Sequence, residues 1–179
     1  MQYSIFSTAD RGKKNVGWLK SNFVFSFSNY YHPLKSAFGT LMAFNDDHME
    51  PGKGFGIHPH INMEIISVLL KGKVNHKDSM GYSSVIEEGG VQIMGPEHCW
   101  INQNARLSLG YFEKGRQIQY AFNPENKCIF IFQIEGDMLV NDIELQKRNA
   151  IGVWETDQIF VDCKDNSEFL IIETPVNQK

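Results

Sequence analysis

Residues 129–138 read Ile-Phe-Ile-Phe-Gln-Ile-Glu-Gly-Asp-Met, and this stretch shows the pattern that decides the fold. An apolar run of strand length ends in the turn signal Glu135-Gly136-Asp137, after which a new apolar run begins. Similar short runs rich in Val, Ile, Phe and Tyr cover residues 23–27, 65–70, 91–94 and 169–172. No comparable apolar stripe at helical spacing occurs. Many short strands between regular turns are typical of a sandwich or barrel, so the sequence predicts an all-β protein.

The same order of features occurs twice. Residues 68–74 and 88–94 read as strand, Gly-centred turn, strand and Gly-led apolar strand, and residues 132–138 and 150–154 repeat this order. Two hairpin-rich segments can look alike by chance, so the pattern alone does not decide between one module and two. We expect two modules, 1–100 and 101–179. No Ser/Gly linker separates them, so we expect them to pack closely.

The composition excludes several classes of protein. Among 179 residues, 17 are basic and 21 acidic, and the basic residues are dispersed, so no nucleic-acid partner is expected. No apolar run approaches the roughly 20 residues that span a bilayer, so no membrane partner is expected. The three cysteines are widely spaced and form no Cys-x-x-Cys pair, which predicts a reducing compartment, the cytoplasm.

The clearest local motif is His58-Pro59-His60. Residues two apart in an extended segment point to one face, so both imidazoles can converge on one ion. If the strand continues, Asn62 and Glu64 share that face, which adds a carboxylate. Such a donor set suits Fe, Mn, Ni, Cu or Zn. The alternative is a surface turn that binds nothing.

The other candidate ligands are less clear. His76 lies in a polar hairpin, which favours a solvated side chain. His98 follows Gly95-Pro96-Glu97 and either reaches the mouth of a barrel or is a loop histidine without a role. The sequence contains no Gly-x-Ser-x-Gly motif, phosphate-binding loop or dinucleotide-binding fingerprint, so those enzyme classes are not expected.

Several stretches occur in the order known from one family: residues 9–12, 17–19, 25–31, 45–47, 51–60, 63–67, 76–81 and 90–94. They resemble the first module of pirin-family proteins. Residues 102–110 with Asn141, Trp154 and Pro175 are similar to the second module of the bacterial branch, which includes proteins with quercetinase activity. The resemblance covers nearly the whole chain.

This resemblance implies a bicupin with one mononuclear metal, usually iron, in the first barrel. The family's ligands are the two histidines of His-Pro-His and a later His-x-Glu motif. His58 and His60 match the first pair. The second pair has no match, because residues 95–103 read Gly-Pro-Glu-His-Cys-Trp-Ile-Asn-Gln and lead directly into the second module. Glu64, Glu97 and His98 are the available substitutes, and His98 falls nearest to the lost motif.

The shortened chain therefore implies an incomplete first barrel with exposed strand edges, which a homodimer would complete. Two imidazoles alone hold a divalent ion weakly, since a mononuclear site normally uses three or four protein ligands. One expectation is a binding or regulatory protein, metal-free or weakly loaded, with weak or absent catalysis. The alternative is a metal-dependent oxidation of a small aromatic ligand, as in quercetin 2,3-dioxygenases. Both remain open at this point.

Overall fold

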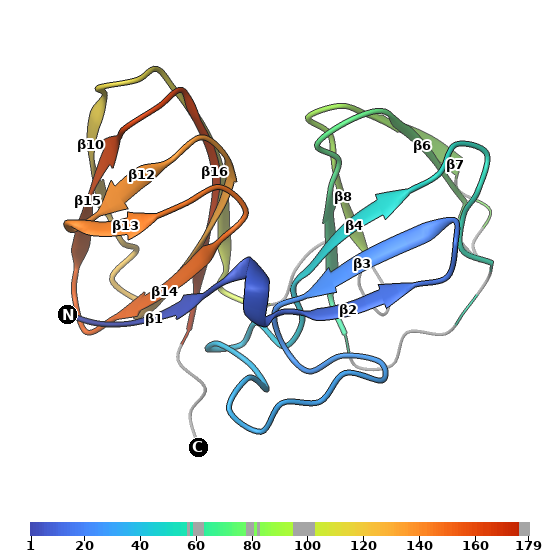
Figure 1. Ribbon diagram of the computed structural model, residues 1–179, viewed down its shortest axis with the longest axis horizontal. Helices are drawn as coiled ribbons and strands as arrows, with labels where there is room; N and C mark the ends of the chain where they lie inside the picture. Colours follow the sequence, from blue (N-terminus) through green and yellow to red (C-terminus); the bar gives the residue numbers. More distant parts are fainter. Residues whose placement is uncertain (57, 59–62, 78–80, 82, 95–102, 176–179) are drawn as a thin grey trace. The chain divides into compact units, whose positions relative to one another are not determined.

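The computed structural model describes residues 1–175 except 57, 59–62, 78–80, 82 and 95–102 (Figure 1). The chain forms two compact units. The larger unit combines Met1–Pro51 with Gln103–Lys179, and the smaller unit is Gly52–Asn102. The predicted division into modules 1–100 and 101–179 stays a prediction.

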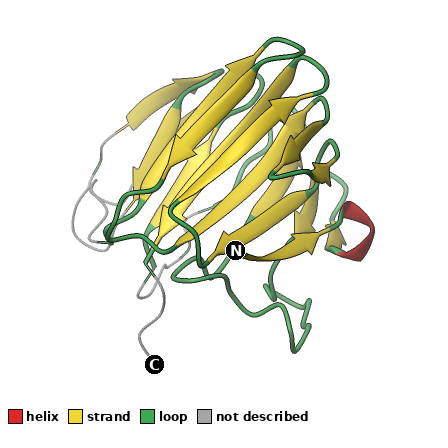
Figure 2. Cartoon of the chain, turned by 90° about the vertical axis from the view of Figure 1, so that its left-hand side faces the viewer, coloured by secondary structure: helices red, strands yellow, loops and turns green. Residues whose placement is uncertain are grey.

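The larger unit contains two antiparallel sheets whose facing sides form one hydrophobic core. The five-stranded sheet has the order β1 (Gln2–Phe6), β14 (Ala150–Trp154), β11 (Cys128–Glu135), β16 (Ser167–Thr174) and β9 (Arg106–Phe112). The four-stranded sheet has the order β10 (Gln117–Ala121), β15 (Gln158–Cys163), β12 (Met138–Val140) and β13 (Ile143–Leu145). Strands supply almost all of the regular structure, as Figure 2 shows.

Strand β11 is buried on both faces, which explains its nearly continuous apolar sequence. Ile129 and Ile131 point into the core between the sheets. Phe130 points the other way, where it packs against four aromatic rings at centroid distances between 4.9 and 6.2 Å. These rings belong to Phe6, Phe25, Phe38 and Phe44. The N-terminal segment thus covers the outer face of the five-stranded sheet.

A third, three-stranded sheet in this unit has the order β2 (Gly12–Asn15), β3 (Leu19–Phe23) and β4 (Asn45–Met49), and a short 3-10 helix, Thr8–Asp10, precedes it. The strand expected at residues 23–27 is wrong beyond Phe23, where β3 ends. Val24 and Phe25 are nevertheless buried. Their apolar character reflects packing of an irregular segment, because Ser26 bonds to the 32–35 turn instead of continuing a ladder.

The smaller unit contains two two-stranded ribbons. In one, β5 (Ile65–Val68) pairs with β8 (Val91–Met94), and in the other β6 (Lys73–Lys77) pairs with β7 (Ser83–Glu87). None of its described residues is fully buried. The all-β prediction is confirmed. In the parts of the chain that the structure describes, no helix has the length and apolar character required to cross a membrane.

Candidate functional site

His58 is the one member of the His-Pro-His motif's histidine pair that the structure describes. Its ring is exposed, lies 5.9 Å from the ring of Phe55, and places Nδ1 2.8 Å from the carbonyl oxygen of Gly56. Because a carbonyl can only accept, Nδ1 carries the proton of this hydrogen bond. In the neutral ring the metal-binding lone pair then lies on Nε2. A ring N–H donated to a backbone carbonyl is the usual arrangement of a metal-ligating histidine, so His58 fits that role.

The remaining predicted ligands are not brought together by the described residues. Glu64 is half-buried just before β5, which begins at Ile65, so neither His58 nor Glu64 lies in a strand. One continuous strand is the condition under which Glu64 would share the face of His58, and residues 59–62 between them lie outside the described residues. His60, Glu97 and His98 lie outside the described residues. Within the described ranges, no three His, Cys, Asp or Glu side chains form a group that could hold a metal ion.

A polar cluster that the sequence did not predict lies inside the larger unit. Glu173 on β16 is fully buried, and its Oε1 accepts a hydrogen bond of 2.6 Å from the hydroxyl of Tyr120 on β10. Its Oε2 accepts a bond of 2.7 Å from the backbone N–H of Asn123. The half-exposed guanidinium of Arg106 lies 3.5 Å from Oε1. A buried carboxylate needs such partners, because an uncompensated charge in the core is strongly unfavourable.

This cluster favours the protonated form of Tyr120. Burial raises the pKa of the Tyr120 hydroxyl, and its hydrogen bond to the Glu173 carboxylate raises the pKa further. The phenol is thus a fixed donor that joins the four-stranded sheet to the five-stranded sheet. The alternation of inward and outward side chains along β10 and β16 is the only sequence signal that could have placed both side chains on an inner face. Nothing in the sequence indicates that the two residues contact each other.

A second charged cluster joins the three-stranded sheet to β11. The Arg11 side chain is almost wholly buried, and its guanidinium lies 5.1 Å above the Phe132 ring. It donates a hydrogen bond to the Arg148 carbonyl and lies 3.7 Å from the Asp46 carboxylate. Arg148 also reaches Asp46, at 3.2 Å, and Glu135, at 3.7 Å. Burial lowers the pKa of Arg11, and the Asp46 carboxylate opposes this shift.

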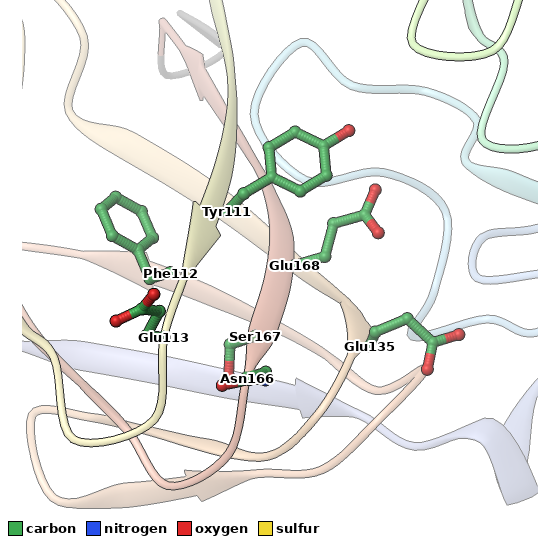
Figure 3. Close-up of a pocket in the computed structure, with 7 residues that line it drawn as sticks. All are labelled: Tyr111, Phe112, Glu113, Glu135, Asn166, Ser167 and Glu168. Carbon is green, nitrogen blue, oxygen red and sulfur yellow. The ribbon is translucent and has the colours of Figure 1, made fainter.

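The larger unit also has a shallow depression of about 290 Å³, which Figure 3 shows. Tyr111 on β9, Glu168 on β16 and Glu135 on β11 are successive partners across the strands. Figure 3 shows these three side chains on one side of β9 and Phe112 on the other. Two carboxylates in adjacent positions repel, and Glu135 is compensated by Lys147 at 2.5 Å. The described lining of this depression has carboxylates but no histidine or cysteine, and one of the carboxylates, Glu135, is already paired with Lys147.

Comparison with protein families finds two matches. The family model described as Pirin matches residues 6–108, and the one described as Quercetinase C-terminal cupin domain matches residues 94–174. The two matches overlap at residues 94–108, where the sequence lacks the His-x-Glu motif. Together they confirm the bicupin fold class.

Known proteins agree with this result. The chain is 49% identical over 108 residues to the quercetin 2,3-dioxygenase of Escherichia coli K12, a match that covers 58% of this chain and 47% of that protein. The chain thus spans about half the length of the curated relatives that it matches first. A putative quercetin 2,3-dioxygenase of Zymomonas mobilis is 26% identical over 222 positions, covering 91% of this chain and 94% of that protein. Because this chain has 179 residues, at least 43 of the 222 aligned positions are gaps in this chain.

Two solved structures show the same fold. YhhW from Escherichia coli matches with a TM-score of 0.90 and 24% identity, covering 99% of this chain and 100% of that one. The same bacterial pirin in complex with nickel(II) matches with a TM-score of 0.86 and 25% identity, covering 98% and 100%. With the Pirin family model covering more than half of its residues, this chain belongs to the pirin family.

Proposed function

We propose that this chain is a pirin-family binding protein with a degenerate mononuclear metal site and with weak or absent catalysis. The observation that carries the proposal is the sequence of residues 95–103, which has one carboxylate, Glu97, and one histidine, His98, in the reverse order of the family's His-x-Glu motif. A mononuclear site normally uses three or four protein ligands. A chain that keeps one ligand pair should bind metal more weakly than its relatives.

The metal would be held by Nε2 of His58 and by His60, with His98, Glu64 or Glu97 as a third ligand. Imidazoles with a carboxylate accept several first-row metals, and iron is the metal that the family resemblance implies. The relative YhhW was crystallised with nickel(II), which supports the choice of nickel as a second probe. A metal with open positions would supply Lewis-acid binding of oxygen groups on a small aromatic ligand. The protein's own part is to fix the His58 tautomer through Gly56.

The second candidate is a metal-dependent quercetin 2,3-dioxygenase. It is supported by the names of the relatives, of which the Escherichia coli protein shares 49% identity over 108 residues. Its substrate would be quercetin or a similar flavonol. We favour the binding protein because the retained ligands are too few for a strongly held ion.

Metal content and oxygen consumption separate the two. The protein is incubated with Fe(II) or Ni(II), desalted, and analysed by mass spectrometry of the metal, and oxygen uptake is then followed with quercetin. We expect less than one metal per chain, a loss of that metal in His58→Ala, and no uptake. His48→Ala is the matched control, because His48 is exposed on β4 and contacts Glu50 at 3.8 Å.

Two other results would change the assignment. One tightly bound metal per chain, with uptake that His58→Ala abolishes, would establish the dioxygenase instead. Trace metal that His58→Ala does not change would remove the metal site from the proposal altogether. The absence of nucleic-acid and membrane partners stays a prediction.

We also place the protein in the cytoplasm, a reducing compartment. Cys128 and Cys163 are both buried and unpaired. Burial raises the pKa of each thiol, which disfavours the reactive thiolate. Free, inert thiols are consistent with a compartment in which disulfides do not form.

A further inference from the structure

Strand β1 is the outermost strand of the five-stranded sheet (Figure 1). It pairs along one side with β14, where Tyr3 lies opposite Val153 and Ile5 opposite Ile151. Among the described residues, Gln2–Phe6 makes no backbone hydrogen bond outside that ladder. Within the described part of the chain, the other side of β1 therefore presents backbone N–H and C=O groups without hydrogen-bond partners.

On the core-facing side of the sheet, rows of apolar side chains in neighbouring positions extend from strand to strand as far as β1. Val153 and Ile151 are fully buried, and the next strand continues the rows with Ile129 and Ile131, also fully buried. Tyr3 and Ile5 end the rows and remain 48% and 47% exposed. The hydrophobic core is therefore incompletely covered at β1, where two large side chains on the same face of the sheet are about half exposed to solvent.

This edge also lacks the features that normally prevent strand pairing. Proteins protect free edges with charged side chains, prolines or bulges. The five residues Gln-Tyr-Ser-Ile-Phe include no charge, no proline and no glycine. The outer strands of the three-stranded sheet do carry such charges, with Lys13 and Lys14 on β2 and Asp46 and Asp47 on β4.

We propose that β1 pairs with β1 of a second copy of this chain, antiparallel, about a two-fold axis through Ser4. In a two-fold contact both copies use the same surface, so a residue near the axis lies close to the identical residue of the partner. Charged residues near the axis would therefore repel each other. Strand β1 has none, which is why a second copy fits it. The register places Tyr3 opposite the partner's Ile5, and the partner's Tyr3 opposite Ile5. Aromatic and β-branched side chains in directly opposite positions stabilise an antiparallel pair.

The proposal is independent of the metal site and of the function proposed above. It also differs from the homodimer that the incomplete first barrel implies, because that contact would use other strands. The β1 contact extends one sheet across two copies and covers Tyr3 and Ile5.

The mass of the full-length chain in solution tests the proposal. The chain carries any tag at its C-terminus, and its mass is measured by size-exclusion chromatography with light scattering over a range of concentrations. We expect a dimer, and we expect Ile5→Lys to raise its dissociation constant about tenfold or more, since an edge lysine opposes pairing. Phe160→Lys is the matched control. Phe160 is 55% exposed on β15, in the other sheet, and its replacement should leave the dimer intact.

Cysteine cross-linking tests the register. In a Cys99→Ser background, Ser4→Cys should form a disulfide-linked dimer on oxidation, because directly opposite Cα atoms lie about 4.5–5.5 Å apart. Gln2→Cys should not, because the two copies of residue 2 would be about 14 Å apart along the strands. A wild-type monomer at every concentration would overturn the proposal. So would a dimer that Ile5→Lys leaves unchanged, and that result would favour the first-barrel strands as the interface.

Discussion

The hydroxyl of Tyr120 donates a hydrogen bond of 2.6 Å to the carboxylate of Glu173, and these two residues join the two sheets of the larger unit. Glu173 has no exposed surface, so its two oxygens depend on the protein for partners: the Tyr120 hydroxyl, the Asn123 N–H and the Arg106 guanidinium. Removing the Tyr120 hydroxyl deletes the short hydrogen bond to Oε1 and leaves that buried oxygen facing the Arg106 guanidinium at 3.5 Å. Substitutions in this cluster should therefore lower the free energy of unfolding.

Tyr120→Phe deletes only the donor. We expect the free energy of unfolding to fall by about 1–3 kcal/mol, which is the usual effect of removing one partner of a buried hydrogen bond. Urea unfolding at neutral pH measures the change. Tyr31→Phe is the control, because Tyr31 is 78% exposed, and it should remain within about 0.5 kcal/mol of the wild type. Equal stability of the two variants would contradict the prediction.

The raised pKa of Tyr120 predicts a pH dependence of stability. The unfolded chain releases this phenol proton near pH 10, whereas the folded chain retains it to higher pH. Stability from this group is complete below about pH 10 and is lost as the pH rises through the folded pKa. The stability difference between wild type and Tyr120→Phe should therefore be unchanged up to about pH 8 and smaller at about pH 11. Urea midpoints of both proteins at each pH give this difference, and a constant difference would be the opposite outcome. Both proteins keep Cys128 and Cys163, whose titration therefore cancels.

Asp46→Ala removes the carboxylate that faces both Arg11 and Arg148. Because the Arg11 side chain is only 1% exposed, the remaining positive charge is buried without compensation. We expect a loss of about 3 kcal/mol of unfolding free energy. Asp162→Ala is the control: its ion pair with Lys164, at 2.7 Å, lies on the surface and should contribute less than about 1 kcal/mol. Equal losses in the two variants, measured by urea unfolding, would argue against a structural role for the Arg11 cluster.

Gly152→Ala tests the packing between β14 and the N-terminal segment. A Cβ at Gly152 would overlap the ring of Phe38, which packs against Phe130. Overpacking of a core usually lowers the unfolding free energy by about 1–3 kcal/mol. The corresponding control is Gly54→Ala, where a Cβ meets nothing within 4 Å and the backbone needs no positive φ. Thermal unfolding should show a lower midpoint for Gly152→Ala only, and unchanged midpoints for both variants would mean that the Phe38 ring moves aside freely.

The candidate metal site and the Glu173 cluster differ in how far the sequence could identify them. The sequence identified His58, and the structure adds the Gly56 carbonyl that sets its tautomer, a contact between residues two apart. The cluster around Glu173 could not be identified, because Tyr120 and Asn123 lie 53 and 50 residues from it. A motif can be recognised when its members are neighbours in the chain. Convergence of distant side chains requires knowledge of the strand order.

The sequence by itself determined that this protein is built of strands, and it located several of them. The run at 91–94 is strand β8, and the runs at 129–134 and 169–172 lie within β11 and β16. Strand formation follows from apolar runs between turn residues, a property of a few consecutive positions.

Only the tertiary structure decided the pairing of β1 with β14, the burial of Phe25 outside any strand, and the contact of Arg11 and Arg148 with Asp46. Each of these joins segments far apart in the chain. Their stability comes from apolar surface that is removed from water when the sheets close and from the pairing of the charges that are buried with it. Their arrangement therefore depends on the whole fold rather than on any local pattern.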